Sequence, residues 1–244
     1  MSNLKSNENG LKINIGCGGR PLEGFINVDM DSLEELEARY PNSVFLQVVW
    51  GRYFFMAFFS IVITSIFFKT HLLFPKGIKI CNWDIFNLPI KDNSVSELLC
   101  EAMIEHLSFE DEPKFFREVK RVLEPGGKFV FSTTNFEEIA KLWLKAEDDW
   151  QDFYRNDEEA IMNKHWFGTY TYDMKNRWGY LIASIFGSQN GEGQFHKNCY
   201  SIKKIQAILK MLSLEEVSHE KFLWKGKRDP MIRFIAKKPI ESTL

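Results

Sequence analysis

The sequence lacks the marks of several common protein classes. Its formal net charge is −2 over 244 residues, whereas proteins that bind nucleic acids usually carry a strongly basic surface or stripe. Its four cysteines lie far apart and form no CxxC pair, so the sequence predicts neither a metal site nor a disulfide framework. These absences argue against a nucleic-acid substrate and favour a reducing compartment.

The chain also lacks an apolar run at its start, internal repeats and low-complexity linkers. Its first ten residues, MSNLKSNENG, are polar, which argues against a secretory signal and makes a cytoplasmic location the expectation. The length suits one α/β domain, because a chain of this size can bury a substantial core. We therefore predict a single domain over residues 1–244.

Strand-like and helix-like runs alternate along the chain, which is typical of a parallel α/β sheet. Helical spacing predicts helices at 112–123 and 201–212. The aromatic-rich region at about 136–200 predicts a helical elaboration over the carboxyl edge of the sheet, on the substrate side.

The expected sheet has seven strands, mostly parallel, with helices on both faces. A turn-like segment at 225–230 predicts that the last two strands form an antiparallel hairpin at the sheet edge. Strands are expected at 12–15, 25–28, 78–81, 95–100, 128–132, near Phe222 and at 232–236.

A glycine-rich segment, Gly16-Cys17-Gly18-Gly19, follows the first expected strand. Ligands of open α/β sheets bind beyond the carboxyl ends of the strands, and glycine lets the backbone turn sharply and approach a ligand closely. Asp29 closes the next strand, where its carboxylate can accept both ribose hydroxyls of an adenosine. A tight turn followed by a solvated aspartate remains the alternative interpretation.

A dehydrogenase is the weaker interpretation of this segment. The acidic residue of a dinucleotide-binding motif falls about 20 residues beyond the glycines, and Asp29 comes sooner. Arg20 and Pro21 also follow Gly19, so the pattern is not GxGxxG.

Three blocks in order resemble a known family. They are KINIGCGGRPLEGFINVDMD at 12–31, NWDIFNLPIKDNSVSELLCEAMIEHL at 82–107 and RVLEPGGKFVFST at 121–133. Together they resemble the class I methyltransferases that use S-adenosylmethionine (SAM), and more narrowly the type 11 group. The segment GSQNGEGQFHK from Gly187 is similar to a late segment of the family, with Gly-Ser in place of its first glycine pair.

The resemblance implies a Rossmann-like fold, SAM as the cofactor and in-line methyl transfer to a small-molecule acceptor, with a sugar or a lipid-linked intermediate as candidates. Carried over by position, the resemblance assigns these residues to the cofactor: Gly16, Cys17 and Gly18 near its methionine part, Asp29 on the ribose, Asp84 and Ile85 beside the adenine, and Glu101 near the methionine end. The alternative role of Asp84 is that of a turn residue or a helix N-cap.

Two histidines are candidates for an acid–base role, which methyl transfer does not require but which helps when the acceptor is a hydroxyl. The ordinary pKa of histidine lies near neutrality, so it is the natural residue for this role. His196 lies in the FHK segment, which in the family would face the acceptor, and we favour it over His106. The alternatives are a surface histidine beside Lys197 and a packing or capping role for His106.

A hydrophobic insert at about 44–76 is the main departure from the family. Its uncharged core, 53–68, would span roughly 24 Å as a helix, against about 30 Å of hydrocarbon. The strands on either side of it should be neighbours in one sheet, which also argues against a membrane span. Peripheral membrane contact through 50–74, a lid over the site and a homodimer contact stay open.

A second class of function also stays open. It is a membrane-associated binding protein that keeps the methyltransferase fold without turnover.

Overall fold

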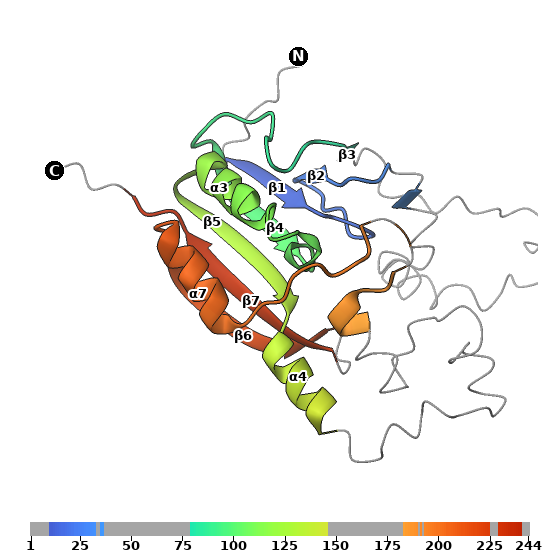
Figure 1. Cartoon of the computed structure of the whole chain (residues 1–244). Coiled ribbons are helices and arrows are strands. Elements are labelled where there is room, and N and C mark those ends of the chain that lie inside the picture. Colours follow the sequence, from blue (N-terminus) through green and yellow to red (C-terminus); the bar gives the residue numbers. More distant parts are fainter. Residues whose placement is uncertain are drawn as a thin grey trace, which may run out of the picture.

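The computed structural model describes residues 10–32, 35–36, 79–145, 183–189, 191, 193–224 and 229–240. Its centre is a seven-stranded sheet in the order β3-β2-β1-β4-β5-β7-β6 (Figure 1). The strands are β1 (Leu11–Ile15), β2 (Ile26–Val28), β3 (Ile80–Cys81), β4 (Val95–Glu101), β5 (Leu123–Thr134), β6 (Glu215–Leu223) and β7 (Pro230–Lys237).

The sheet is mostly parallel, with one antiparallel edge. Strands β1 to β5 pair in parallel, whereas β7 runs antiparallel to both β5 and β6. This arrangement confirms the predicted α/β sheet and its closing antiparallel pair. Strand order reverses between β1 and β4, so the loops that follow these two strands border the position where ligands of such sheets bind.

Strand β5 begins earlier than its apolar pattern predicts. The expected strand starts at Lys128, after a turn at Pro125-Gly126-Gly127, but β5 begins at Leu123, directly after helix α3 (Glu112–Val122). The pairing with β4 shifts register between Val95 and Glu97, which leaves the Pro-Gly-Gly residues as an irregularity within the strand. A Cβ on Gly127 would lie 2.7 Å from the carbonyl oxygen of Val95, so only glycine fits beside β4.

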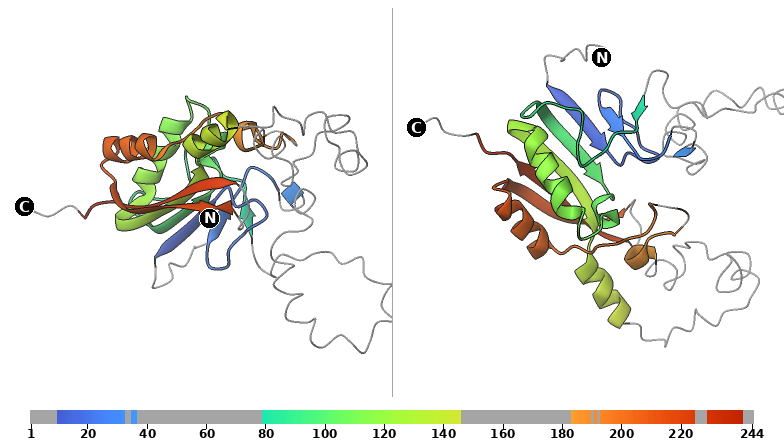
Figure 2. Two further views of the ribbon diagram at one scale, coloured as in Figure 1. Left: turned by 90° about the horizontal axis from the view of Figure 1, so that it is seen from below. Right: turned by 45° about the horizontal axis from the view of Figure 1, so that its top comes forward.

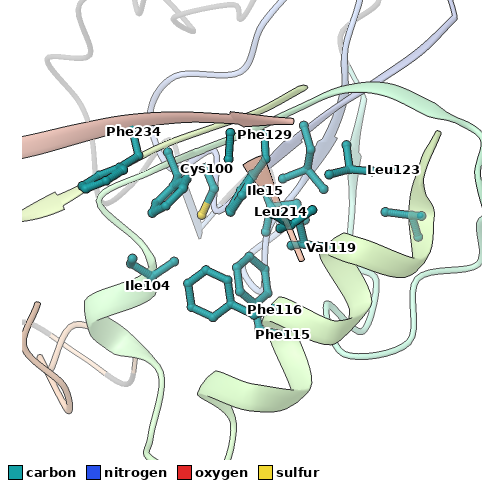
Figure 3. Packing of buried hydrophobic residues seen from close by; sticks show 14 of the residues in the cluster. Ile15, Cys100, Ile104, Phe115, Phe116, Val119, Leu123, Phe129, Leu214 and Phe234 are labelled. Atoms are coloured by element: carbon teal, nitrogen blue, oxygen red, sulfur yellow. The ribbon is translucent and has the colours of Figure 1, made fainter. Parts of the chain in front are cut away.

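The hydrophobic core lies between the sheet and helix α3. The apolar residues of the helix recur at helical spacing, and Phe115, Phe116 and Val119 are almost completely buried. They pack on Phe129 of β5, and Phe129 and Phe131 stack with their ring centroids 4.3 Å apart. Figure 3 shows the rings of Phe115, Phe116 and Phe129 near Cys100 of β4 and Ile104, which follows that strand.

Two further helices begin at side-chain caps. Asn135 accepts a hydrogen bond from the Glu138 amide at the start of α4 (Phe136–Leu144), and Ser201 does the same for Lys204 at the start of α7 (Ile202–Met211). A short 3-10 helix, η1 (Ile104–His106), follows β4. Figures 1 and 2 show α3 and α7 on the same face of the sheet.

Several sequence predictions fall on other parts of the chain. The insert at 44–76 and the middle of the elaboration predicted at 136–200 lie outside the described residues, and the single-domain assignment stays a prediction. Within the described ranges, no helix has both the length and the apolar character that a membrane crossing needs.

Candidate functional site

A cavity of about 700 Å³ lies at the carboxyl ends of the parallel strands. Gly16 and Gly18 after β1, Asp29 after β2 and Met103 after β4 all line it. Loops from neighbouring parallel strands meet at one edge of a sheet, so residues distant in sequence converge there. The volume is in the range of small-molecule and cofactor sites.

The loop after β1 takes a conformation that glycine favours. Gly16 has a φ of 65° and Gly18 a φ of 49°, and few residues with a Cβ adopt such angles. The Gly16 amide donates to the Val28 carbonyl over 2.8 Å. A Cβ on Gly16 would also lie 2.5 Å from Cγ of Met103. The loop therefore turns back tightly against β2 and presents its backbone to the cavity.

Asp29 holds this loop in place from the end of β2. One carboxylate oxygen, Oδ2, accepts a hydrogen bond from the Gly18 amide over 2.8 Å, and Oδ1 accepts one from the Asp31 amide over 3.2 Å. The side chain is 9% exposed and lines the cavity. The alternative of a solvated aspartate does not describe this residue.

Asp84 and Ile85 lie in the loop after β3, and both line the cavity. The Asp84 carboxylate accepts a hydrogen bond from the Phe86 amide over 2.9 Å, and its carbonyl accepts one from the Asn87 amide over 3.1 Å. Asp84 is therefore a turn aspartate as well as a residue of the cavity wall.

His106 and His196 meet in the same cavity. Their ring centroids lie 4.8 Å apart and the rings are nearly perpendicular, with an interplanar angle of 78°. The Nδ1 atom of His106 lies 3.0 Å from the Phe195 carbonyl, and that of His196 lies 3.0 Å from the Ser184 carbonyl. Because a carbonyl only accepts hydrogen bonds, each Nδ1 is the protonated nitrogen, and each neutral ring keeps a lone pair on Nε2.

The surroundings of both imidazoles favour the neutral form. Burial lowers the pKa of His106, although its hydrogen bond to Phe195 works in the opposite direction. Burial, together with the neighbouring His106, lowers the pKa of His196 to about 4. The two rings therefore act as hydrogen-bond acceptors through Nε2.

Comparison with known proteins agrees with this geometry. Residues 66–131 match a family model described as a methyltransferase domain. The fold is similar to that of a SAM-dependent methyltransferase from Methanosarcina mazei, with 16% identity over 96% of this chain and 95% of that chain and a TM-score of 0.52. The chain thus combines a methyltransferase-domain match with the fold of a SAM-dependent methyltransferase.

A second structure, a protein from Pyrococcus horikoshii, is similar to this methyltransferase at 13% identity over 95% of this chain and 82% of that chain, with a TM-score of 0.50. At such identities the likeness of the two structures concerns the fold. No curated protein matches the sequence. The methyltransferase-domain match and this fold support SAM as the cofactor.

Cys17 and Glu101 are the two predicted cofactor residues that do not line the cavity. The Cys17 side chain is buried, and burial and the adjacent Asp29 raise the pKa of its thiol. Glu101 lies between two arginines, with Oε1 accepting from Arg233 over 3.2 Å and Oε2 from Arg20 over 3.5 Å. It therefore ties the glycine loop to β7, and the structure does not bring it to the methyltransferase cavity.

Glu105 also lines the cavity; it stands with His106 one helical turn beyond Glu101, a position from which the sequence predicts an approach to the methionine end of the cofactor. Its side chain is 1% exposed, and Oε2 accepts a hydrogen bond from the Thr133 hydroxyl over 3.0 Å. Burial raises the pKa of this carboxyl to about 7, and nearby Asp229 also raises it.

Asp229 is a cavity residue that the sequence does not indicate, because no local pattern marks it. It lies in the segment that the sequence presents as a hairpin turn, yet it lines the cavity and accepts a hydrogen bond from the Ser184 hydroxyl. Burial raises the pKa of its carboxyl, and the Ser184 bond partly offsets this. One end of the cavity is thus lined by two carboxyl groups and two imidazole rings.

Proposed function

We propose that this methyltransferase transfers the methyl group of SAM to a small-molecule acceptor bound beside His106 and His196. The observation that carries the proposal is that one cavity joins the glycine loop and Asp29 at one end to this histidine pair at the other. A cofactor lying against the loop would therefore have an acceptor space next to it.

The residues present fit the cofactor. The close approach of Met103 to Gly16 leaves a narrow backbone cradle that a Cβ would fill, and we assign the methionine part of SAM to it. The buried Asp29 carboxylate would accept the ribose hydroxyls. Asp84 and Ile85 would lie beside the adenine, with a carboxylate for its amino group and apolar surface for its ring.

Bound SAM supplies an electrophilic methyl group on a sulfonium, and the protein supplies the geometry. Holding the acceptor in line with the methyl–sulfur bond lowers the activation barrier by about 7–11 kcal/mol, because the reaction of two molecules then becomes effectively unimolecular. The Nε2 lone pairs of His106 and His196 would accept hydrogen bonds from the acceptor and fix its orientation. Both rings are half-buried, which shields them in part from bulk water.

Replacing His196 by alanine is expected to reduce turnover roughly tenfold, the effect of one lost hydrogen bond, with SAM affinity nearly unchanged. Initial rates with methyl-labelled SAM, together with calorimetric titration of SAM, measure both quantities. His219→Ala is the matched control, because His219 lies on β6 and pairs with Glu216 outside the cavity. Equal losses of turnover and SAM affinity in His196→Ala would remove the acceptor-side role.

The methyltransferase-domain match supports an enzyme over a binding protein without turnover. Sugar and lipid-linked acceptors remain our candidates for the acceptor scaffold. Calorimetry with SAM and with S-adenosylhomocysteine is the direct test of the cofactor site, since a degenerate cavity would bind neither.

We further propose that the enzyme acts in the cytoplasm and that the insert at 44–76 makes a peripheral contact. Flotation of the full chain with anionic liposomes, beside a variant lacking 50–74, tests contact with a membrane surface. If the full chain stays in the soluble fraction, the proposed membrane contact is refuted, and a lid or a homodimer contact remains as the role of the insert.

A further inference from the structure

The charged side chains of the cavity are unevenly divided between the two signs. Among the residues that the structure describes, five carboxyl groups line the cavity against a single lysine: Asp29, Asp84, Glu105, Asp111 and Asp229 against Lys197. SAM brings a sulfonium and an ammonium against one carboxylate, so it offsets only one of these negative charges. The cavity therefore keeps an excess of acidic groups around the acceptor when SAM is bound.

Three of the five carboxylates are already assigned to the cofactor or paired with a cation. Asp29 and Asp84 accept hydrogen bonds from backbone amides, and we assign them to the nucleoside. Asp111 accepts bonds from the Lys114 ammonium and the Ser108 hydroxyl. The remaining two, Glu105 and Asp229, have no cationic partner among the described side chains. Glu105 is hydrogen-bonded by the Thr133 hydroxyl and by backbone groups of Glu105 and Thr134, and Asp229 by the Ser184 hydroxyl.

Glu105 and Asp229 belong to one site. They interact electrostatically with each other, and both border the same cavity as the histidine pair. Burial removes these carboxyls from the solvent that would otherwise stabilise their charge, and in the described part of the chain neither forms an ion pair. A cationic group bound between them would supply the missing compensation.

The histidine pair adds an independent observation. Both rings use Nδ1 as a donor to a backbone carbonyl, and in the described residues no donor reaches Nε2 of His106 or of His196. The acceptor end of the cavity therefore presents two carboxylates and two imidazole lone pairs. A hydroxyl offers one proton to these acceptors, whereas a primary ammonium offers three.

We infer that the methyl acceptor is a primary or secondary amine, bound as an ammonium by Glu105 and Asp229 beside the histidine pair. This inference rests on the proposed function and specifies its substrate class. An amino group on a sugar satisfies both this inference and the sugar expectation. Acceptors with a carboxylate or a phosphate at the reacting end would face like charge without a described cation beyond Lys197.

The transfer step balances for this acceptor. One ammonium proton passes to the Glu105 carboxylate, which leaves a neutral amine with a free lone pair. The nitrogen then forms a bond to the methyl carbon as the carbon–sulfur bond breaks, and the sulfonium becomes the neutral thioether of S-adenosylhomocysteine. The product leaves as the methylated ammonium, and Glu105 returns its proton to water.

Glu105 is suited to this proton transfer. Its carboxyl has a pKa of about 7, so it takes and releases a proton near neutrality. The titratable groups that interact with it are Asp229 ahead of β7, Cys100 on β4 and Tyr200 ahead of α7. None of these three carries a positive charge.

A matched set of three probes tests the inference on the full chain loaded with S-adenosylhomocysteine. Calorimetric titration compares phenethylamine, 2-phenylethanol and 3-phenylpropanoate, which share a phenyl group and differ in the charge of the end group. We expect the amine to bind roughly 10- to 100-fold more tightly than the alcohol, as for hydrogen bonds to charged groups. The carboxylate should bind most weakly.

Two variants assign the preference to the carboxyl pair. Glu105→Gln and Asp229→Asn should each weaken amine binding roughly 10- to 100-fold, with little change for the alcohol or for S-adenosylhomocysteine. Glu138→Gln is the control, because Glu138 pairs with Lys141 and Lys221 at α4, outside the cavity. Asp229→Asn keeps the test decisive if loss of the more deeply buried Glu105 carboxylate impairs folding.

The outcomes separate this inference from the proposed function. An alcohol or carboxylate bound as tightly as the amine, or an amine preference that survives both variants, overturns the inference while leaving the enzyme a methyltransferase. A parallel loss of amine and S-adenosylhomocysteine affinity in Glu105→Gln would assign that carboxylate to the cofactor's ammonium instead. Wild-type protein that binds no S-adenosylhomocysteine refutes the proposed function itself.

Discussion

Replacing Phe131 by alanine is expected to lower the free energy of unfolding by about 3–5 kcal/mol, as for other fully buried aromatic residues. Phe131 is completely buried and stacks between Phe129, at 4.3 Å, and Phe234, at 5.6 Å between ring centroids. Removing its ring leaves a cavity bounded by β-sheet backbone, which cannot collapse to fill it. Urea denaturation followed by circular dichroism measures the change.

The control for this substitution is an exposed phenylalanine, whose side chain contributes little to the free energy of unfolding. Phe109 is 76% exposed in the loop before α3, so Phe109→Ala should change the free energy of unfolding by no more than about 0.5 kcal/mol. Similar effects of the two substitutions, or a Phe131→Ala effect below about 1 kcal/mol, would contradict the described core.

The sequence predicts the fold well wherever a structural element depends on a local pattern. The apolar residues of α3 recur at helical spacing, and the expected helix at 112–123 differs from the observed Glu112–Val122 only at its last residue. Strands β1 and β4 are short apolar runs bounded by turns, and they also lie where expected. The start of β5 could not be predicted in this way, because Leu123 joins the strand through its pairing with Val95 of β4, across a register shift that leaves 124–127 without a partner on β4.

The same distinction between local patterns and long-range contacts applies to the residues of the candidate site. Gly16, Gly18 and Asp29 follow strands directly, so their place at the sheet edge is readable from the sequence. Glu101 also ends a strand, but successive strand residues face opposite sides of the sheet. Cys100 enters the core, and the Glu101 carboxylate reaches Arg233, which is 132 residues away in the sequence.

The acceptor end depends almost entirely on long-range contacts. His106 and His196 were predicted as competitors for one role, and only the folded chain shows that they are neighbours. The hydrogen bond between Ser184 and Asp229 spans 45 residues. No spacing rule connects such positions, so the sequence indicates the two histidines but neither their pairing nor the presence of Asp229.

Replacing Asp29 by alanine is expected to weaken SAM binding roughly 10²–10³-fold, about the effect of losing two hydrogen bonds to a charged group. The substitution removes the carboxylate proposed to accept the ribose hydroxyls. It also releases the Gly18 amide, which Asp29 Oδ2 holds over 2.8 Å, and so loosens the loop proposed to cradle the methionine part. Calorimetric titration with SAM and with S-adenosylhomocysteine measures the loss.

A second variant separates these two effects of Asp29. Asp29→Asn keeps a side-chain oxygen for the Gly18 amide but loses the charge and one of the acceptors, so its SAM affinity should lie between those of the wild type and Asp29→Ala. Asp92→Asn is the control, because Asp92 pairs with Arg121 outside the cavity. Wild-type affinity in Asp29→Ala would show that the cofactor does not lie along this loop, and the acceptor space would then have to be placed anew. Wild-type affinity in Asp29→Asn alone would mean that the carboxylate acts on the cofactor mainly by shaping the glycine loop.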